Sequence, residues 1–276
     1  TGNDNISGNA GTDTIAFGSN LTSADTVDGG AGTDTLTFTD GDSATTDLNN
    51  VTNVETVTLG NATTSVTTVN ALVASGQSLA VSAAALTGSN TLTWDGSAES
   101  DGTFNITGSG QNDTITGGGG ADSIVGGAGN DALNFASGAI LALDATVDGG
   151  ADTDTVTFTA TVTDVDDTDF ARVANIEAVS LSNGNNSVSF GTNAATASGA
   201  GALTITSGTG NDTISVSALG KAAHISSNSG NDSITAGTGN DNISGNAGTD
   251  TIAFGSNLTS ADTVDGGAGT DTLTFT

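Results

Sequence analysis

The chain of 276 residues contains no cysteine, proline, methionine or tyrosine, and its only lysine and arginine are Lys221 and Arg172. Without cysteine, neither a disulfide framework nor a thiolate metal site can form. The 31 acidic residues give a formal net charge of −29. This argues against nucleic acid and anionic membranes as partners, because both are bound through Lys and Arg. The absence of methionine predicts an interior or processed piece.

Large apolar side chains are also scarce. Hydrophobic residues make up 34% of the chain, many of them alanine, and aromatic residues make up 4%. This is too little for the thick core of a globular domain of this length. No apolar run reaches the roughly 18 residues of a transmembrane helix, and Thr1 does not begin a signal peptide. Composition alone would indicate disorder, unless the fold is thin, repetitive and neutralised by bound cations.

What the chain has instead is a short period of glycine and aspartate. Asp232, Asp241 and Asp250 are nine residues apart, and each stands after a glycine-rich turn and two residues before an isoleucine. Glycine permits backbone conformations closed to other residues, and aspartate supplies anionic oxygen atoms. The isoleucine is the only residue of each period that can face a core.

A longer repeat is superimposed on the short one. Residues 1–39 recur without change as residues 238–276, and Asp4, Asp122 and Asp241 occupy equivalent positions. The repeating unit is therefore about 118 residues long, in two variants. We predict a first module at 1–112, which lacks its first nonamer, a divergent second module at 113–231, and the start of a third at 232–276.

Short strands are expected between and within the glycine-rich segments, because apolar residues alternate with polar ones over about five residues. The turns between them contain Gly, Asn, Ser and Thr. The pattern predicts an all-β solenoid in which nonamers and wider rungs form one stack. Apolar residues three apart, at Leu48/Val51/Val54 and Phe170/Val173/Ile176, predict a short helical turn in each copy. The expected strands contain Val57/Leu59, Val66, Leu79/Val81, Leu92/Trp94, Phe104/Ile106, Val179/Leu181, Val188/Phe190, Leu203/Ile205 and Ile214/Val216.

The repeated aspartates are the candidate metal ligands. Ca²⁺ takes six to eight oxygen ligands, prefers carboxylates and backbone carbonyls, and tolerates irregular geometry. Asp25, which a three-residue insertion hides, lies nine residues before Asp34 and two before Val27. The nonamer candidates are Asp4, Asp13, Asp25, Asp34, Asp113, Asp122, Asp131, Asp144, Asp154, Asp212, Asp232, Asp241, Asp250, Asp262 and Asp271.

A second interpretation is that these aspartates only form turns, since Asp does so without a metal. The number of repeats favours metal binding for the nonamer aspartates. For Asp28, Asp148 and Asp265, which precede Gly-Gly, the two interpretations are equally supported. For Glu55 and Glu177 we favour a structural role.

The nonamers resemble a known family. G-G-G-G-A-D-S-I-V at 117–125, followed by G-G-A-G-N-D-A-L-N at 126–134, is similar to the glycine-aspartate nonapeptide of RTX proteins. The resemblance implies a parallel β-roll built from calcium-binding turns that alternate between two sides. It also implies that Ca²⁺ lies between turns two repeats apart, with glycine carbonyls completing the shell.

Carried onto this chain, the resemblance pairs Asp113 with Asp131 and Asp232 with Asp250, and it places Asp122 and Asp241 on the opposite side. Two turns depart from the pattern, since Gln111 is an extra residue before Asp113, and Asp152 replaces a glycine before Asp154. Several Ca²⁺ ions are thus expected along the chain.

Groups suited to catalysis are few. The only histidine, His224, lies in K-A-A-H, without a nucleophile elbow or a zinc-ligand pattern. The four glycines at 117–120 lack the lysine of a phosphate loop, and no pair of carboxylates is marked as belonging to a cleft. We expect a structural His224 and no enzymatic activity.

Two non-enzymatic functions remain. The first is an extracellular structural module of a calcium-dependent bacterial surface protein that forms an S-layer, fibre or matrix filament, by self-association or as tandem copies in one chain. The second is the stalk or ligand-binding region of a giant adhesin, with cell-surface polysaccharide as a candidate ligand. An ice-binding variant needs a regular Thr/Asn array, whereas G-T-G-N-D occurs only at 208–212 and 237–241. The resemblance implies type I secretion and folding on calcium binding outside the cell.

Overall fold

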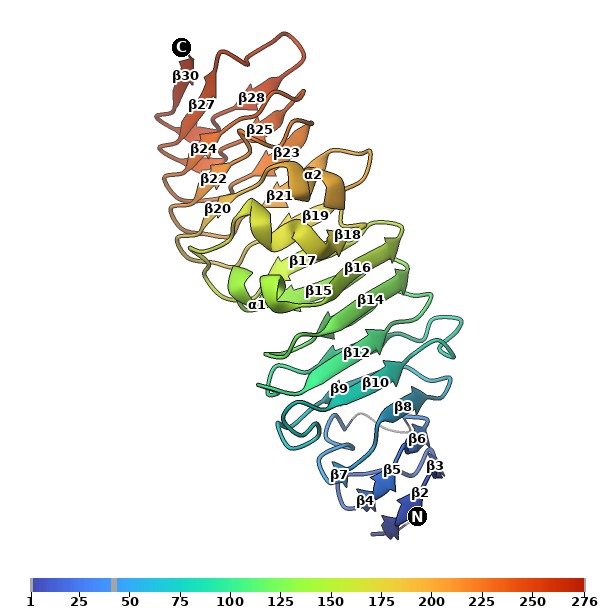
Figure 1. Cartoon of the computed structure of the whole chain (residues 1–276). Coiled ribbons are helices and arrows are strands. Elements are labelled where there is room, and N and C mark those ends of the chain that lie inside the picture. Colours follow the sequence, from blue (N-terminus) through green and yellow to red (C-terminus); the bar gives the residue numbers. More distant parts are fainter. Residues whose placement is uncertain (1, 41–43, 276) are drawn as a thin grey trace. The chain divides into compact units, whose positions relative to one another are not determined.

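The computed structural model describes residues 2–40 and 44–275. The chain is an all-parallel β-solenoid of about 13 turns with little helix, which confirms the predicted fold class. It divides into two compact units, unit 1 (Thr1–Leu133 and Leu143–Asp152) and unit 2 (Asn134–Ala142 and Thr153–Thr276). In each unit, successive coils of chain stack their strands side by side (Figure 1). The three modules defined by sequence repetition stay a prediction.

Unit 1 has two main stacks of strands. In one the order is β16-β14-β12-β10-β8-β6-β3, and in the other β13-β11-β9. Shorter strands pair as β1-β4-β7 and β2-β5. The strands are β1 (Asn5–Ser7), β2 (Ala10–Gly11), β3 (Thr14–Gly18), β4 (Thr26–Asp28), β5 (Ala31–Gly32), β6 (Thr35–Phe38), β7 (Val51–Thr52), β8 (Thr56–Leu59), β9 (Thr64–Thr67), β10 (Ser78–Ser82), β11 (Leu92–Asp95), β12 (Thr103–Thr107), β13 (Thr114–Thr116), β14 (Ser123–Ala128) and β16 (Thr146–Ala151).

Unit 2 repeats this arrangement. Its two main stacks have the orders β28-β25-β23-β21-β19-β17 and β20-β22-β24-β27-β30, and β26 pairs with β29. The elements are β17 (Thr155–Phe158), η1 (Asp167–Arg172), β18 (Val173–Ala174), β19 (Ala178–Ser180), β20 (Ser187–Ser189), α2 (Thr192–Ala197), β21 (Leu203–Thr206), β22 (Thr213–Ser215), β23 (Ala223–Ser226), β24 (Ser233–Thr235), β25 (Asn242–Ser244), β26 (Ala247–Gly248), β27 (Thr251–Gly255), β28 (Thr263–Asp265), β29 (Ala268–Gly269) and β30 (Thr272–Phe275). Residues 132–143, where the chain passes between units, contain β15 (Ala132–Phe135) and α1 (Gly138–Leu143).

The core is a pair of narrow apolar columns in each unit. Because side chains alternate between the two faces of a strand, the single apolar residue of a nonamer points inward and stacks on its equivalent in the next coil. In unit 1 such a column runs through Val57, Val81, Ile106, Ile124 and Val147, all at most 2% exposed. Burying each of these side chains stabilises the fold by about 1.5–3 kcal/mol. Every strand predicted from period-two alternation is present.

The helical turns agree with the prediction in one copy only. Phe170 lies in the 3₁₀ helix η1, and Val173 begins β18. At Leu48/Val51/Val54 the chain forms only a turn at 47–50, in which the Val51 N–H donates to Leu48 O at 3.1 Å, and no helix. Val51 then begins β7, as Val173 begins β18. None of the helices in the described residues is long and apolar enough to cross a membrane.

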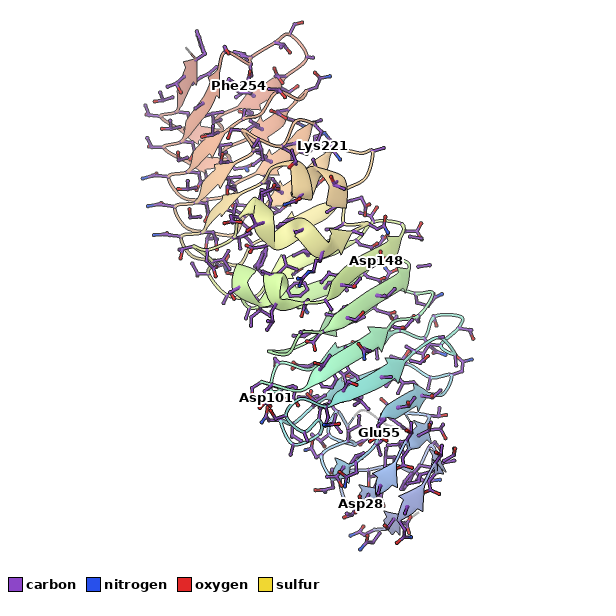
Figure 2. The ribbon with its side chains drawn as sticks, in the orientation of Figure 1. Asp28, Glu55, Asp101, Asp148, Lys221 and Phe254 are labelled. Carbon is purple, nitrogen blue, oxygen red and sulfur yellow. The ribbon has the colours of Figure 1, made fainter. Side chains whose placement is uncertain are left out.

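Helix α2, which the sequence did not predict, is held at both ends by charged side chains. The Asp167 carboxylate accepts the N–H groups of Gly191 and Ala194 at 2.7 and 3.0 Å and that of Asn193 at 3.1 Å. At the other end, Lys221 Nζ donates to Gly199 O at 2.8 Å and to Ser198 at 3.0 Å. Figure 2 shows Lys221 beside α2. The only lysine of the chain is therefore used to cap a helix.

Candidate metal centre

Aspartates of successive coils form ladders. In unit 2, the Asp212 N–H donates to Asp232 Oδ1 at 2.8 Å, the Asp232 N–H to Asp250 Oδ1 at 2.8 Å, and the Asp250 N–H to Asp271 Oδ1 at 3.0 Å. The register explains this ladder, since each aspartate immediately precedes a strand that pairs with the strand of the next coil. We call such a column of stacked acidic residues a carboxylate ladder.

The predicted pairs lie in these ladders. The Asp113 N–H donates to Asp131 Oδ1 at 2.7 Å, so these two aspartates occupy neighbouring coils, as do Asp232 and Asp250. Asp122 and Asp241 belong to the other stack of strands in their units, where their N–H groups donate to Asp144 Oδ1 and Asp262 Oδ1 at 3.0 and 2.7 Å. The two-sided arrangement expected from the resemblance is thus present in the geometry.

The second oxygen atom of many ladder carboxylates has no hydrogen-bond partner, although it is buried. This is true of Oδ2 of Asp34, Asp122, Asp212, Asp232 and Asp250. Each of these five aspartates is at most 2% exposed. A buried anionic oxygen without a partner is costly. These atoms therefore point to a positively charged ligand.

The backbone packs closely beside this second oxygen. A Cβ placed on Gly245, five residues before Asp250, would lie 2.5 Å from Asp250 Oδ2 and 2.6 Å from the carbonyl oxygen of Gly266 in the next coil. A carboxylate oxygen of an aspartate and a carbonyl oxygen of the next coil are close to Gly8 and Gly108 in the same way. Only glycine permits this close approach. A carboxylate and a carbonyl oxygen directed at one point form part of a Ca²⁺ ligand set.

In four candidate aspartates, both carboxylate oxygens accept hydrogen bonds from the protein itself. Asp25 Oδ2 accepts the N–H and Oγ of Thr22, and Asp262 Oδ2 accepts the same groups of Thr259. The N–H groups of Asp4 and Thr22 hold the pKa of Asp25 below its usual value. Oδ2 of Asp113 accepts the Ser109 N–H, and Oδ2 of Asp241 that of Gly237. At Asp25 and Asp262, the geometry favours the turn-forming interpretation.

The remaining candidate aspartates differ in how far they are buried. Asp4 and Asp271, in the end coils, are exposed, and Asp13 is half-buried. Asp131, Asp144 and Asp154 are buried. The aspartates before Gly-Gly lie outside the ladders, where Asp28 accepts Asn53 Nδ2 at 2.8 Å, Asp265 accepts the Gly267 N–H at 3.0 Å, and Asp148 is half-buried (Figure 2).

Glu55 and Glu177, for which the sequence analysis favoured a structural role, are members of the ladders. The Asp34 N–H donates to Glu55 Oε2 at 2.7 Å, and the Asp154 N–H to Glu177 Oε2 at 2.9 Å. The sequence does mark these two positions, because E-T-V at 55–57 and E-A-V at 177–179 match D-T-L at 34–36, which contains a ladder aspartate. An acid two residues before an inward apolar residue identifies the ladder position better than the glycines do.

The ladders are interrupted where an apolar residue occupies the ladder position. Their registers place Leu79 opposite Phe104 in unit 1, and Leu203 opposite Ala223 in unit 2. Leu92 likewise precedes Asp113 in the other stack, and its N–H donates to Asp113 Oδ1 at 2.7 Å. The five apolar residues at these positions are each at most 1% exposed. These coils contain no buried acid at that position.

Burial changes the acidity of the ladders. Desolvation raises the pKa of Asp144 to about 8, with the charge of Asp122 adding to the effect. Desolvation and the charge of Glu99 raise the pKa of Asp122 to about 6. Burial also raises the pKa of Asp232 and of Asp241. Asp144 therefore holds a proton near neutral pH unless a cation takes its place.

The donor set suits calcium better than other metals. No group of three or more His, Cys, Asp or Glu side chains that could hold a metal occurs in the described residues, so backbone carbonyls must supply further ligands, as Ca²⁺ accepts. His224 lies exposed on β23 and belongs to no such group. Bound Ca²⁺ would supply positive charge, while the residues named above would orient it.

Comparison with known proteins gives one family. The model of the RTX calcium-binding nonapeptide repeat matches residues 1–20, 21–43, 105–139, 226–257 and 259–274. A search of the curated proteins gives no match. The matched segments contain most of the nonamer aspartates, whereas the ladder members Asp144, Asp154 and Asp212 lie outside them. RTX nonapeptides bind calcium at multiple sites across the repeats. The chain is an RTX-type calcium-binding repeat protein.

Proposed function

We propose that the chain is an extracellular structural module of a bacterial surface protein, that it folds when calcium binds after secretion, and that it forms an S-layer, fibre or filament. The observation that carries this proposal is the set of buried ladder carboxylates whose second oxygen has no partner. A chain of net charge −29 with two Lys/Arg residues cannot neutralise them itself.

Calcium then supplies part of the folding free energy. A metal site that does not exist in the unfolded chain couples ion binding directly to folding. Where calcium is scarce, as in a bacterial cytosol, self-repulsion keeps the chain unfolded and suited to type I export. Outside the cell, bound Ca²⁺ ions neutralise the ladder carboxylates and link neighbouring coils.

The hollows of the solenoid support a structural role rather than catalysis. One hollow of unit 1 is lined by residues 52–55, 71–74 and 77–78, and Glu55 is its only ionisable residue. Acid–base catalysis at that place would lack a second group. RTX repeats themselves are structural.

Circular dichroism during a calcium titration tests the folding proposal. We expect little β-structure in excess chelator and a cooperative gain as calcium is added. Magnesium serves as the control ion, because it requires a tighter octahedron of ligands and should be much less effective. Full β-structure in chelator would refute the proposal.

Electron microscopy with and without chelator tests the assembly. A two-dimensional lattice would identify an S-layer and threads a fibre, whereas isolated rods would favour the stalk of an adhesin. The ordered assembly should disappear in chelator, because its modules unfold.

A further inference from the structure

Glu99 is a buried acid outside the nonapeptides. It lies in the turn between β11 and β12, at residues 96–102, which no segment of the family match includes. Its Oε1 accepts the N–H groups of Ser100, Asp101 and Gly102 at 3.0, 3.2 and 2.9 Å. Its Oε2 is buried without a hydrogen-bond partner, and the residue is 2% exposed. Figure 2 marks this turn through Asp101.

Asp122 lies in the coil that packs on this turn. Its Oδ1 accepts the Phe104 N–H at 2.7 Å, while Oδ2 is buried without a partner. The two coils are in direct contact, since the Gly119 N–H donates to Glu99 O at 2.9 Å. Two buried carboxylates thus each have one satisfied and one unsatisfied oxygen.

The four glycines at 117–120 allow this approach. A Cβ on Gly118 would lie 2.6 Å from Gly96 O and 3.3 Å from Glu99 Cβ, and a Cβ on Gly117 would collide with Asp122 Oδ2. Only glycine therefore fits at 117 and 118, where the backbone contacts Asp122 on one side and the turn of Glu99 on the other. Backbone carbonyl oxygens, such as Gly96 O, lie in the same region.

No cation of the protein can neutralise the pair within its unit. The sequence of unit 1 contains no lysine, arginine or histidine. An ionised pair buried without a counterion would be strongly unfavourable.

We propose that Glu99 and Asp122, with backbone carbonyls of the turns at 96–102 and 117–120, bind one Ca²⁺ ion. In this site Glu99 replaces the aspartate that a preceding nonapeptide would provide. The site lies at the end of the ladder, where a wider coil precedes the nonapeptides. The inference rests on the proposed function, because it assumes that ladder carboxylates such as Asp122 bind calcium.

Trp94 provides a local probe. It is the only tryptophan of the chain, it is fully buried in β11 just before the turn, and its ring meets that of Phe104 edge to face at 5.4 Å. Tb³⁺, which replaces Ca²⁺ at oxygen sites, emits strongly when a nearby tryptophan is excited. Emission excited through Trp94 therefore reports on ions near this turn, and direct excitation reports on all bound Tb³⁺.

The test compares Glu99→Gln with Asp34→Asn in the full chain. Glutamine keeps an oxygen for the three N–H groups of the turn but removes the charge. We expect Glu99→Gln to lose much of the Trp94-excited emission and to bind one Ca²⁺ ion fewer. Asp34→Asn should also bind one ion fewer and should keep that emission, since β6 and β12 are separated by two intervening strands.

Asp113 is another ladder acid near Trp94, because it precedes β13, which pairs with β11. Asp113→Asn shows how much of the emission an ion there contributes. If Glu99→Gln keeps the Trp94-excited emission and the ion count of the unsubstituted chain, the inference is wrong. It is also wrong if the unsubstituted chain binds Tb³⁺ but shows no Trp94-excited emission. A parent that binds no Ca²⁺ at all would instead refute the proposed function.

Discussion

The two oxygen atoms of a ladder carboxylate have different surroundings. In Asp232 and Asp250, Oδ1 is fixed by an N–H of the previous coil, and Oδ2 is buried with no partner. The first contact needs only the backbone, so it can hold the side chain in position before an ion arrives. The second oxygen is then presented to a ligand at little cost in side-chain entropy.

The acidity of the ladders predicts a pH dependence of the ion-free chain. Asp144 and Asp122 have folded-state pKa values raised to about 8 and about 6, whereas unfolded aspartate titrates near pH 4. The folded state therefore holds more protons, and the free energy of unfolding falls as pH rises from about 4 to about 8.

In chelator, we expect more β-structure by circular dichroism at about pH 5 than at about pH 8. Asp144→Asn, which carries no charge at any pH, should show a weaker dependence. A rise in β-structure with pH in chelator would contradict the assignment. Saturating calcium should abolish the dependence near neutral pH, because the ion replaces the proton.

Sequence and structure agree best where one residue fixes the local geometry. The inward isoleucine two residues after each aspartate fixes the register of its strand, whereas the pairing of Asp232 with Asp250 was expected from the resemblance to RTX nonapeptides. Glu99 could not be found this way, because its burial depends on the contact of its turn with the glycines at 117–120. Spacing within a nonamer also could not show that Thr22 occupies the second oxygen of Asp25.

At the scale of elements, the helical segments mark where the solenoid departs from nine-residue turns. The apolar spacing at Phe170 and at Leu48 leads into a strand in both copies, β18 and β7. A 3₁₀ helix precedes the strand in the second copy, whereas the first copy has a shorter turn. Helix α2 is short, buries Ala194 and Ala197, and is capped by charged side chains at both ends.

Removal of one of these charges should destabilise unit 2. Asp167→Ala deletes the acceptor of three N–H groups at the start of α2, and we expect a loss of about 1–2 kcal/mol. Asp164→Ala is the matched control, since Asp164 is an exposed acid on the same segment. Urea unfolding in saturating calcium measures both. An equal effect of the two substitutions would show that capping contributes little.

At the scale of the whole molecule, residues 1–39 and 238–276 place one sequence in two environments. Leu36 and Phe38 are 0% and 3% exposed beneath the coil that contains β8. Their copies Leu273 and Phe275, in the last described coil, are 43% and 66% exposed. Burial here is set by the neighbouring coil and not by local sequence.

The same substitution in both copies should therefore have unequal effects. Leu36→Ala should cost about 2–5 kcal/mol, as for a buried leucine, and Leu273→Ala much less. Urea unfolding of the two variants in calcium provides the comparison. Equal losses would mean that the last coil is covered in solution, for instance by a second copy of the chain.

Each interruption of a ladder affects one side of a coil only. The coils with Leu203 and Ala223 at the ladder position of one stack contain Asp212 and Asp232 in the other stack. Removal of calcium should therefore weaken the acidic side of such a coil first, because its apolar side contains no acid to neutralise at that position. A solenoid is stabilised mainly by nearest neighbours. The apolar sides can therefore keep neighbouring coils in register, so that the acidic sides can close again when calcium returns.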